Sequence, residues 1–249
     1  RTFEVDRSNM SINVGPMPRG PVTVSFPAVT ASSFRIEFTR LRRNSALAEI
    51  QLSASARLER FVEKQLGKMH PAPLPLWDTY LWPEPQEPES RELVIAPERV
   101  VDLTDKLGED GVFEWNVPPG EWIILRTGMT PTGTQNAPAS PEGKGLEVDK
   151  MNRKAARGHF KAFIGKVLAR VPPEQRAAFT RVVADSYEMG SQNWTDGFAS
   201  LFKKQYGYDP LLWLPVLTGR IVGSAEQSER FLWDLRRLVA DRIAEDYVG

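Results

Sequence analysis

Residues 183–196 read Val-Ala-Asp-Ser-Tyr-Glu-Met-Gly-Ser-Gln-Asn-Trp-Thr-Asp, and this stretch decides the predicted fold. The apolar run from Val182 to Ala184 is typical of a buried parallel strand. It ends in Asp185 and Glu188, and a glycine, two amides, an aromatic ring and a further carboxylate follow before a helical pattern begins. In α/β barrels the loops at the carboxyl ends of the strands build the site. The stretch therefore predicts a barrel strand that delivers carboxylates and aromatic rings to a sugar-binding site.

Residues on both sides of this stretch continue the pattern of an α/β barrel. Trp122 to Leu125 form a continuous apolar run, as expected for a second strand covered on both faces, and a long polar loop follows. Caps, apolar periodicity and proline or glycine stops predict three helices, from Asn152 to Pro172, from Trp194 to Gly207 and from Ser224 to Ile243. This order of elements predicts that residues 121–249 are the first part of a (β/α) TIM-type barrel.

The N-terminal part has a different period. Between residues 22 and 56, apolar and polar side chains alternate in short segments split by turn residues, which predicts an antiparallel β-sandwich with one buried face. The pattern resembles the second half of a galactose-binding-like jelly roll. We therefore expect an α+β multidomain chain, with a partial β-sandwich over residues 1–70, a β-rich connecting region over 71–120 and the partial barrel over 121–249.

Composition limits the classes of partner. The 249 residues carry 32 Lys and Arg against 32 Asp and Glu, so the net charge gives no support for nucleic acid or an anionic membrane as a partner. No apolar run approaches the roughly 20 residues of a membrane span. The absence of Cys excludes disulfides and thiolate chemistry, and two His leave little room for a zinc site. Because the sequence starts at Arg1 within a strand-like pattern and stops at Gly249 just after a helix, we expect an internal piece of a longer protein.

Asp185 and Glu188 are the candidate catalytic residues. Glycoside hydrolysis needs one carboxylic acid to protonate the departing oxygen and one carboxylate that acts on the anomeric carbon, directly or through water. Tyr187 and Trp194 would form walls of the substrate site, with Asn193 as a hydrogen-bonding partner. The competing interpretation is a helix N-terminus at which the two carboxylates only satisfy backbone donors.

A second group of candidates is Glu147, Asp149 and Lys150. The two carboxylates alternate with an apolar residue and follow two glycines, so we expect them to point the same way from a loop. They could bind sugar hydroxyls or a hard cation such as Ca²⁺. The competing interpretation is a helix N-terminal region whose carboxylates pair with Lys150 and Arg153.

Several motifs keep a common order along the second half of the chain. They are Arg126-Thr127-Gly128, Gly145 to Lys150, Asp185-Ser186-Tyr187-Glu188, Asn193-Trp194-Thr195, Leu217-Thr218-Gly219-Arg220 and Phe231-Leu232-Trp233-Asp234. Together they resemble the glycoside hydrolase family 106 α-L-rhamnosidases. The resemblance implies a large bacterial enzyme, periplasmic or extracellular, that removes terminal α-L-rhamnose from polysaccharides or glycosides with inversion and with the help of Ca²⁺.

The resemblance also assigns roles to residues. It implies that Glu188 is the general acid and that the general base is a glutamate beyond Gly249. From the residues themselves, we expect Asp185 to support the acid as a neighbouring like charge, and Glu147 stays open as a rival base. The calcium ligands are not mapped by the resemblance, and we expect the 249-residue chain alone to be inactive. Two other hypotheses remain: a sugar-binding sandwich joined to an inactive barrel remnant, and a retaining glycosidase of another barrel family.

Overall fold

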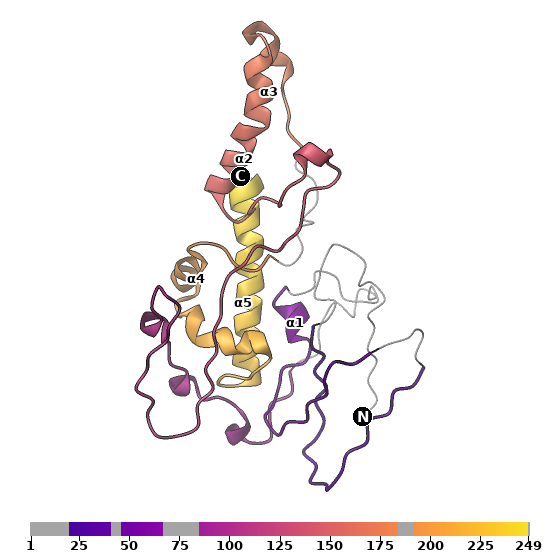
Figure 1. Ribbon diagram of the computed structural model, residues 1–249, viewed down its shortest axis with the longest axis vertical. Coiled ribbons are helices and arrows are strands. Elements are labelled where there is room, and N and C mark those ends of the chain that lie inside the picture. Colours follow the sequence, from indigo (N-terminus) through magenta and orange to yellow (C-terminus); the bar gives the residue numbers. More distant parts are fainter. Residues whose placement is uncertain (1–19, 41–45, 67–84, 184–191, 249) are drawn as a thin grey trace.

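The computed structural model describes residues 20–40, 46–66, 85–183 and 192–248 (Figure 1). Its centre is the long helix α5 (Ala225–Ile243), with α1 (Phe61–Lys64), α4 (Phe198–Tyr206) and the 3-10 helix η7 (Pro210–Thr218) around it. Helices α2 (Arg153–Ala162) and α3 (Ile164–Arg170) extend away from this centre as an arm. The remaining short elements are η2 (Arg91–Leu93), η3 (Pro97–Arg99), η4 (Thr104–Lys106), η5 (Pro141–Gly143), η6 (Pro173–Ala178) and η8 (Ala244–Val248).

Two caps fix the start of α5. The Ser224 hydroxyl oxygen accepts a hydrogen bond from the Gln227 N–H at 3.0 Å, as its N-cap position predicts. The Glu87 carboxylate, from a distant segment, accepts the N–H groups of Ala225 at 3.0 Å and of Glu226 at 2.9 Å. A negative charge at this end also complements the helix dipole. The free N–H groups in the first turn of α5 therefore find acceptors in two separate parts of the chain.

Aromatic rings join α4 to α5. Phe198 and Phe202 on α4 are fully buried, and the ring centre of Phe202 lies 5.7 Å from that of Phe231 on α5. Tyr208 meets Phe202 edge to face at 5.0 Å, an arrangement that aromatic pairs favour. Helix α4 ends at Gly207, which adopts a left-handed φ of 80°, as its place after the last apolar position predicts.

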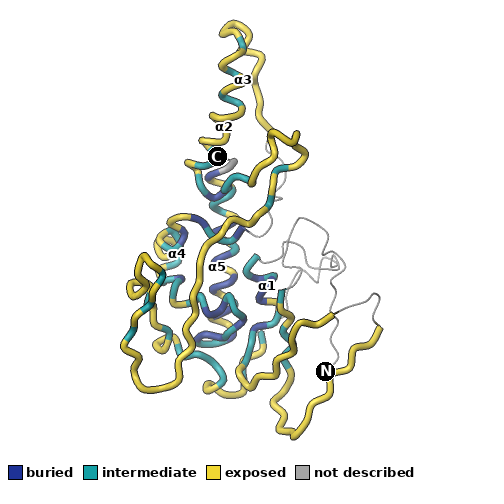
Figure 2. Tube along the Cα trace, in the orientation of Figure 1, coloured by how far each residue is buried: buried dark blue, intermediate teal, exposed yellow. Residues whose placement is uncertain are grey.

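A glycine allows α1 to approach η7 closely. Gly219 has a φ of 80°, and its carbonyl accepts the Leu58 N–H at 2.8 Å. A Cβ at this position would lie 2.7 Å from Cδ1 of Phe61. Because only glycine combines this backbone conformation with this clearance, Phe61 can pack directly over the turn. The contact places α1 in the core, which is the dark part of the trace in Figure 2.

The arm begins and ends where the sequence predicts, but it is not one straight helix. Asn152 caps α2 by accepting the Ala155 N–H at 3.1 Å, and α3 ends before Pro172. The two helices are separated at Phe163, whose φ of −107° and ψ of −80° depart from helical values. The exposed fraction of Phe163 is 60%, and most of the arm is exposed in Figure 2.

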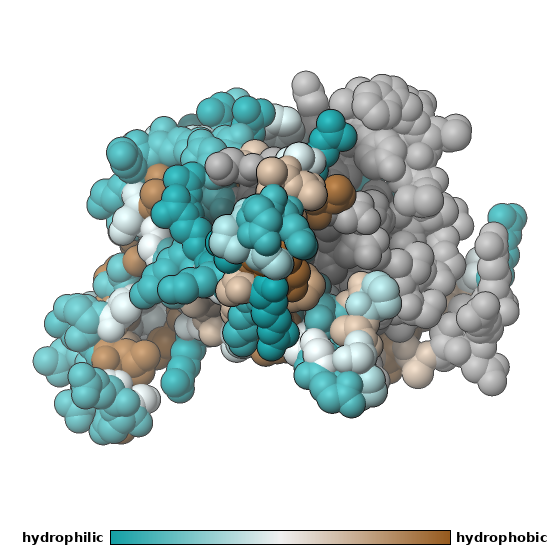
Figure 3. All heavy atoms as spheres, turned by 90° about the horizontal axis from the view of Figure 1, so that it is seen from above, coloured by the Kyte–Doolittle hydropathy of each residue, from teal (hydrophilic) through white to brown (hydrophobic). Residues whose placement is uncertain are grey.

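The expectation of a β-sandwich followed by barrel strands is wrong for the described residues, which are helical and contain no extended strand. The β-pairing among the described residues consists of isolated bridges: Arg57 with Arg220, Ile95 with Val222, Leu107 with Phe113, and Gln135 with Leu146. The alternating residues 22–38 and the apolar run 122–125 have no neighbouring strand, so their side chains remain exposed, at 47% for Phe34 and 72% for Ile123. Apolar atoms reach the surface at several places in Figure 3. Alternation alone does not make a strand without partners to pair with.

The expected domain limits at residues 70 and 120 are not tested by this arrangement and remain predictions. Among the helices in the described ranges, none has the length and apolar character that crossing a bilayer requires.

Candidate functional site

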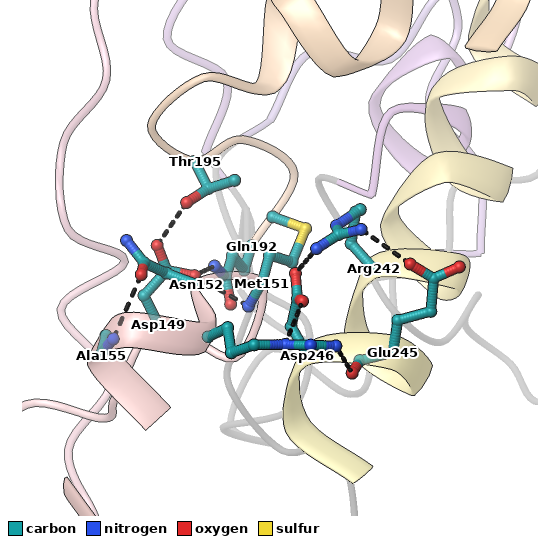
Figure 4. A network of polar contacts seen from close by, with 10 residues as sticks. Asp149, Met151, Asn152, Ala155, Gln192, Thr195, Arg242, Glu245 and Asp246 are labelled. Atoms are coloured by element: carbon teal, nitrogen blue, oxygen red, sulfur yellow. Dashed lines mark hydrogen bonds and ion pairs between the residues drawn. The ribbon is translucent and has the colours of Figure 1, made fainter. Parts of the chain in front are cut away.

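The predicted site residues fall into two groups. Asp185, Tyr187 and Glu188 lie outside the described residues, so their roles remain predictions. The other five are described, and they lie in two segments, 147–150 and 193–194. The carboxylate of Asp149 in the first segment contacts Gln192 and Thr195, the residues on either side of the second (Figure 4).

Asp149 accepts three hydrogen bonds. Its Oδ1 accepts one from the Gln192 side-chain amide and one from the Met151 N–H at 2.9 Å. Its Oδ2 accepts one from the Thr195 hydroxyl at 2.5 Å. Gln192 and Thr195 are buried, with exposed fractions of 7% and 2%. Asp149 therefore connects two segments that are more than 40 residues apart in the sequence.

Backbone contacts hold the segment that carries Asp149. The Glu147 N–H donates to the Thr134 carbonyl at 2.9 Å, and the Gly145 N–H donates to the Asn136 side chain at 2.8 Å. Three residues after Asp149, Asn152 starts α2. The Asp149 carbonyl accepts the Asn152 N–H at 3.2 Å. The backbone at Asp149 is therefore held on one side by the contacts of residues 145 and 147 and on the other by the start of α2.

Glu147 and Lys150 form an ion pair of their own. The Lys150 Nζ lies 3.5 Å from Glu147 Oε2, and the exposed fractions of the two side chains are 8% and 23%. The contact matches the competing interpretation of this segment, in which a carboxylate pairs with Lys150. Glu147 and Asp149 thus have different partners, although the sequence suggested that they point the same way.

Asn193 and Trp194 face the helical core. The Asn193 amide donates to the Gln65 carbonyl at 2.8 Å, beside α1. The Trp194 ring lies 4.7 Å from the ring centre of Phe198 on α4. Both residues are half-buried. Their proposed part in substrate binding is not tested by these contacts and remains a prediction.

Gln192 and Thr195 are not among the site residues predicted from the sequence. A signal for them was present, because both are polar residues directly after the Asp185–Glu188 motif and both flank the predicted pair Asn193 and Trp194. What could not be predicted is that their partner is Asp149, since hydrogen bonds across 43 and 46 residues depend on the tertiary fold.

A second polar cluster lies on the other side of the start of α2 (Figure 4). The buried Asp246 carboxylate accepts from Arg153 at 3.1 Å and pairs with Arg242. Arg153 also donates to the Glu245 carbonyl at 2.7 Å. Two guanidinium groups thus compensate the charge of a buried carboxylate, which would otherwise be costly. The cluster ties α2 to η8.

In the part of the chain that the structure describes, no three His, Cys, Asp or Glu side chains gather closely enough to hold a metal ion. The two candidate carboxylates do not form such a group. Asp149 accepts hydrogen bonds from three donors, and Glu147 pairs with Lys150. The calcium requirement therefore remains a prediction from the family resemblance.

Comparison with known proteins gives the chain a family. The sequence pattern of glycoside hydrolase family 106, described as alpha-L-rhamnosidase, matches residues 6–249. A solved rhamnosidase from Novosphingobium sp. PP1Y is similar in structure, with a TM-score of 0.59 and 30% sequence identity over 79% of this chain and 18% of that chain. A protein of Formosa agariphila named "Putative beta-glucuronidase" is 44% identical over 156 residues, which are 63% of this chain and 13% of that protein.

The chain thus spans less than a fifth of the length of either relative. The family pattern, in contrast, covers nearly all of the chain and includes both segments that carry predicted site residues. On this evidence the chain belongs to glycoside hydrolase family 106, the alpha-L-rhamnosidase family.

Proposed function

We propose that this chain is part of an inverting glycoside hydrolase that removes terminal α-L-rhamnose from polysaccharides or glycosides. The observation that carries the proposal is the family match over residues 6–249, which includes the Asp185–Glu188 motif. The structural similarity to a rhamnosidase over 79% of the chain supports it independently. The proposed enzyme acts in the periplasm of a bacterium or outside the cell.

In the proposed reaction, Glu188 is the general acid. Its carboxylic acid gives a proton to the glycosidic oxygen as the bond to the anomeric carbon breaks. A second carboxylate takes a proton from water, whose oxygen attacks the same carbon from the opposite face. The neighbouring Asp185 supports the acid, because a nearby negative charge favours the protonated form of a carboxyl group.

The proposed substrate contacts come from both described segments. Glu147 and Lys150 carry opposite charges on one loop, where they form an ion pair. We propose that Asn193 contributes an amide and that Trp194 and Tyr187 contribute aromatic faces. Asp149 accepts hydrogen bonds from three donors of the protein, and its part in substrate binding remains a prediction.

The name of the Formosa agariphila relative supports a second candidate, hydrolysis of β-glucuronides. The two sugars differ in charge, because a glucuronide carries a carboxylate and a rhamnoside carries a methyl group in its place. A glucuronidase therefore needs a cation at the sugar site, and Lys150 is a described cation within the candidate segment.

The two candidates are separated by a direct comparison of substrates. A protein that contains this chain at the full length of its relatives should be assayed on nitrophenyl α-L-rhamnoside and nitrophenyl β-D-glucuronide. We expect hydrolysis of the rhamnoside and none of the glucuronide, and the reverse result would replace the proposal with the second candidate.

The same protein tests the role of Glu188. The Glu188→Gln variant keeps the size of the side chain but has no acidic proton, so hydrolysis of an alkyl rhamnoside should fall about 10²–10⁴-fold. A rhamnoside with an acidic phenol as the leaving group should lose much less, because this group departs without protonation. Equal losses on both substrates would show that Glu188 is not the acid.

A further inference from the structure

A tryptophan lies between two arginines on the solvent side of α5. In the motif from Phe231 to Asp234, Trp233 alone is exposed, at 59%, whereas the other three residues are buried. Arg230 and Arg237 lie three residues before and four residues after Trp233, so they share its side of the helix. We call these three residues the α5 face. A single exposed ring is common on protein surfaces, so its neighbours decide whether it is part of a site.

Both arginines of the α5 face are held by carboxylates of the same helix. Arg230 Nε donates to Asp234 at 2.9 Å, and Arg237 Nε donates to Asp241 at 3.3 Å. Asp241 also accepts from the Gln205 amide at 3.3 Å, which fixes it to α4. The two guanidinium groups are thus oriented before any ligand arrives, and this lowers the entropy that binding would cost.

Each guanidinium group keeps a second edge for a ligand. The hydrogen bonds to Asp234 and Asp241 are made by Nε, and among the described residues none is made by the terminal amino groups of Arg230 or Arg237. The side chains of these two arginines are 70% and 64% exposed. Two amino groups form a planar fork that matches the two oxygens of a carboxylate. Each arginine can therefore bind a further carboxylate while it keeps its partner in the helix.

A third arginine orients the ring. The guanidinium carbon of Arg236 lies 5.7 Å from the centre of the Trp233 ring, which is a cation–π contact. Arg236 is half-buried and donates to the Lys64 carbonyl beside α1, so it is itself fixed. An exposed aromatic ring of fixed orientation offers a flat apolar surface. The C–H groups on one face of a sugar ring fit such a surface.

The carboxylates along this stretch of α5 are less exposed than the two arginines. Asp234 is 2% exposed, and the Glu229 side chain, which pairs with Lys64, is 18% exposed. The Asp241 side chain is 30% exposed, and the exposed Glu226 lies about two turns before the ring. The charges that reach solvent beside Trp233 are therefore mainly positive, which favours an anionic ligand.

We propose that the α5 face binds a polysaccharide of uronic acids, with one sugar ring stacked on Trp233 and sugar carboxylates bound by Arg230 and Arg237. The two arginines are seven residues apart, which is about 10 Å along a helix. Two linked sugar rings can span that distance. This binding site is independent of Glu188 and of the glycoside that the enzyme hydrolyses.

The test measures binding without turnover. A full-length protein containing this chain should be applied, in biolayer interferometry, to sensors that carry polygalacturonate, dextran sulfate or dextran. We expect binding to polygalacturonate that weakens as salt is added, weaker binding to dextran sulfate and none to dextran. Polygalacturonate contains no rhamnose and no glucuronate, so neither candidate activity interferes.

Variants of the α5 face identify the residues that bind. Trp233→Ala and Arg237→Gln should each weaken binding to polygalacturonate about tenfold, because Trp and Arg carry much of the binding energy where they are central to a contact. Trp233→Tyr, which keeps an aromatic ring, should lose much less. Arg230→Lys keeps a charge for Asp234 but has no fork, so it should also bind more weakly. The matched control Arg157→Gln neutralises an exposed arginine of α2 and should change nothing.

Several results would overturn the proposal. They are no binding of the unaltered protein to polygalacturonate, equal binding to dextran, tighter binding to dextran sulfate, and equal losses in Arg237→Gln and Arg157→Gln. If Trp233→Ala lowers the melting temperature, the comparison of Arg237→Gln with its control and the retention of binding by Trp233→Tyr decide instead. Failure of the protein to hydrolyse rhamnosides would refute the proposed function and leave this test unaffected.

Discussion

Asp234 is a buried carboxylate, with an exposed fraction of 2%, and its partners explain why the core accepts it. Its Oδ2 accepts from the Tyr208 hydroxyl at 3.0 Å and its Oδ1 accepts from Arg230 at 2.9 Å. Burial, and then the charge of Asp234, raise the pKa of Tyr208 well above its usual value of 10. The native state therefore keeps the Tyr208 proton at pH values at which an unfolded chain has lost it.

This difference predicts a pH dependence of stability. Above about pH 10 the unfolded state binds fewer protons than the native state, so the free energy of unfolding falls as the pH rises. In Tyr208→Phe, the free energy of unfolding at pH 7 should be about 1.5 kcal/mol lower, because a hydrogen bond to a charged group is lost. The fall in the free energy of unfolding above pH 10 should also be shallower in this variant than in the unaltered protein. Tyr206, whose pKa is raised mainly by burial, should supply the part that remains.

The measurement is urea unfolding of both proteins between pH 7 and pH 11. Parallel profiles for the two proteins would contradict this assignment, since they would mean that Tyr208 does not contribute to the alkaline loss. Tyr206→Phe is the matched control for the loss at pH 7, because it removes a hydroxyl from the neighbouring position without breaking the bond between Tyr208 and Asp234.

At the level of elements, the helices could be predicted and the strands could not. Asn152, Gly207 and Ser224 end or begin helices through contacts within a few residues, so local sequence is enough to place them. A strand is stable only beside another strand, and the described residues around Phe34 and Ile123 have no such neighbour. Prediction of the site is limited for the same reason. Asp149 could be identified as a polar candidate, but its partners lie more than 40 residues away and could not be predicted.

Glu87 also shows an effect that the local sequence does not predict. Its carboxylate caps α5 from a position 138 residues earlier in the chain. The Glu87→Gln variant keeps an oxygen acceptor but removes the charge that complements the helix dipole, so the free energy of unfolding should fall by about 0.5–2 kcal/mol. Urea unfolding followed by helical circular dichroism would measure this change.

The matched control for Glu87 is Glu89→Gln, which neutralises an exposed carboxylate two residues away. We expect it to change the free energy of unfolding by less than about 0.5 kcal/mol. If both variants lost the same amount, the effect of Glu87 would be one of net charge, and the cap would have no special role.

For the molecule as a whole, family membership could be predicted from the sequence, and the architecture of the described part could not. The ordered motifs from residues 126 to 234 carried the family resemblance, and the match over residues 6–249 confirms it. The β-sandwich and barrel expected with them are absent from the described residues, whose core is built around α5. Ordered motifs identify a family through its site residues. Alternating apolar residues form a strand only where a second strand pairs with them, and the local sequence does not specify that second strand.

We propose above that this chain is part of an inverting α-L-rhamnosidase, and the anomer released first tests this. The most direct measurement is a proton NMR time course of a full-length protein containing this chain with an α-L-rhamnoside, recorded before the released sugar equilibrates between anomers. We expect β-L-rhamnose to appear first, because water attacks the face opposite to the leaving group. Initial accumulation of the α anomer would contradict inversion, and no release of rhamnose from any α-L-rhamnoside would contradict the substrate assignment.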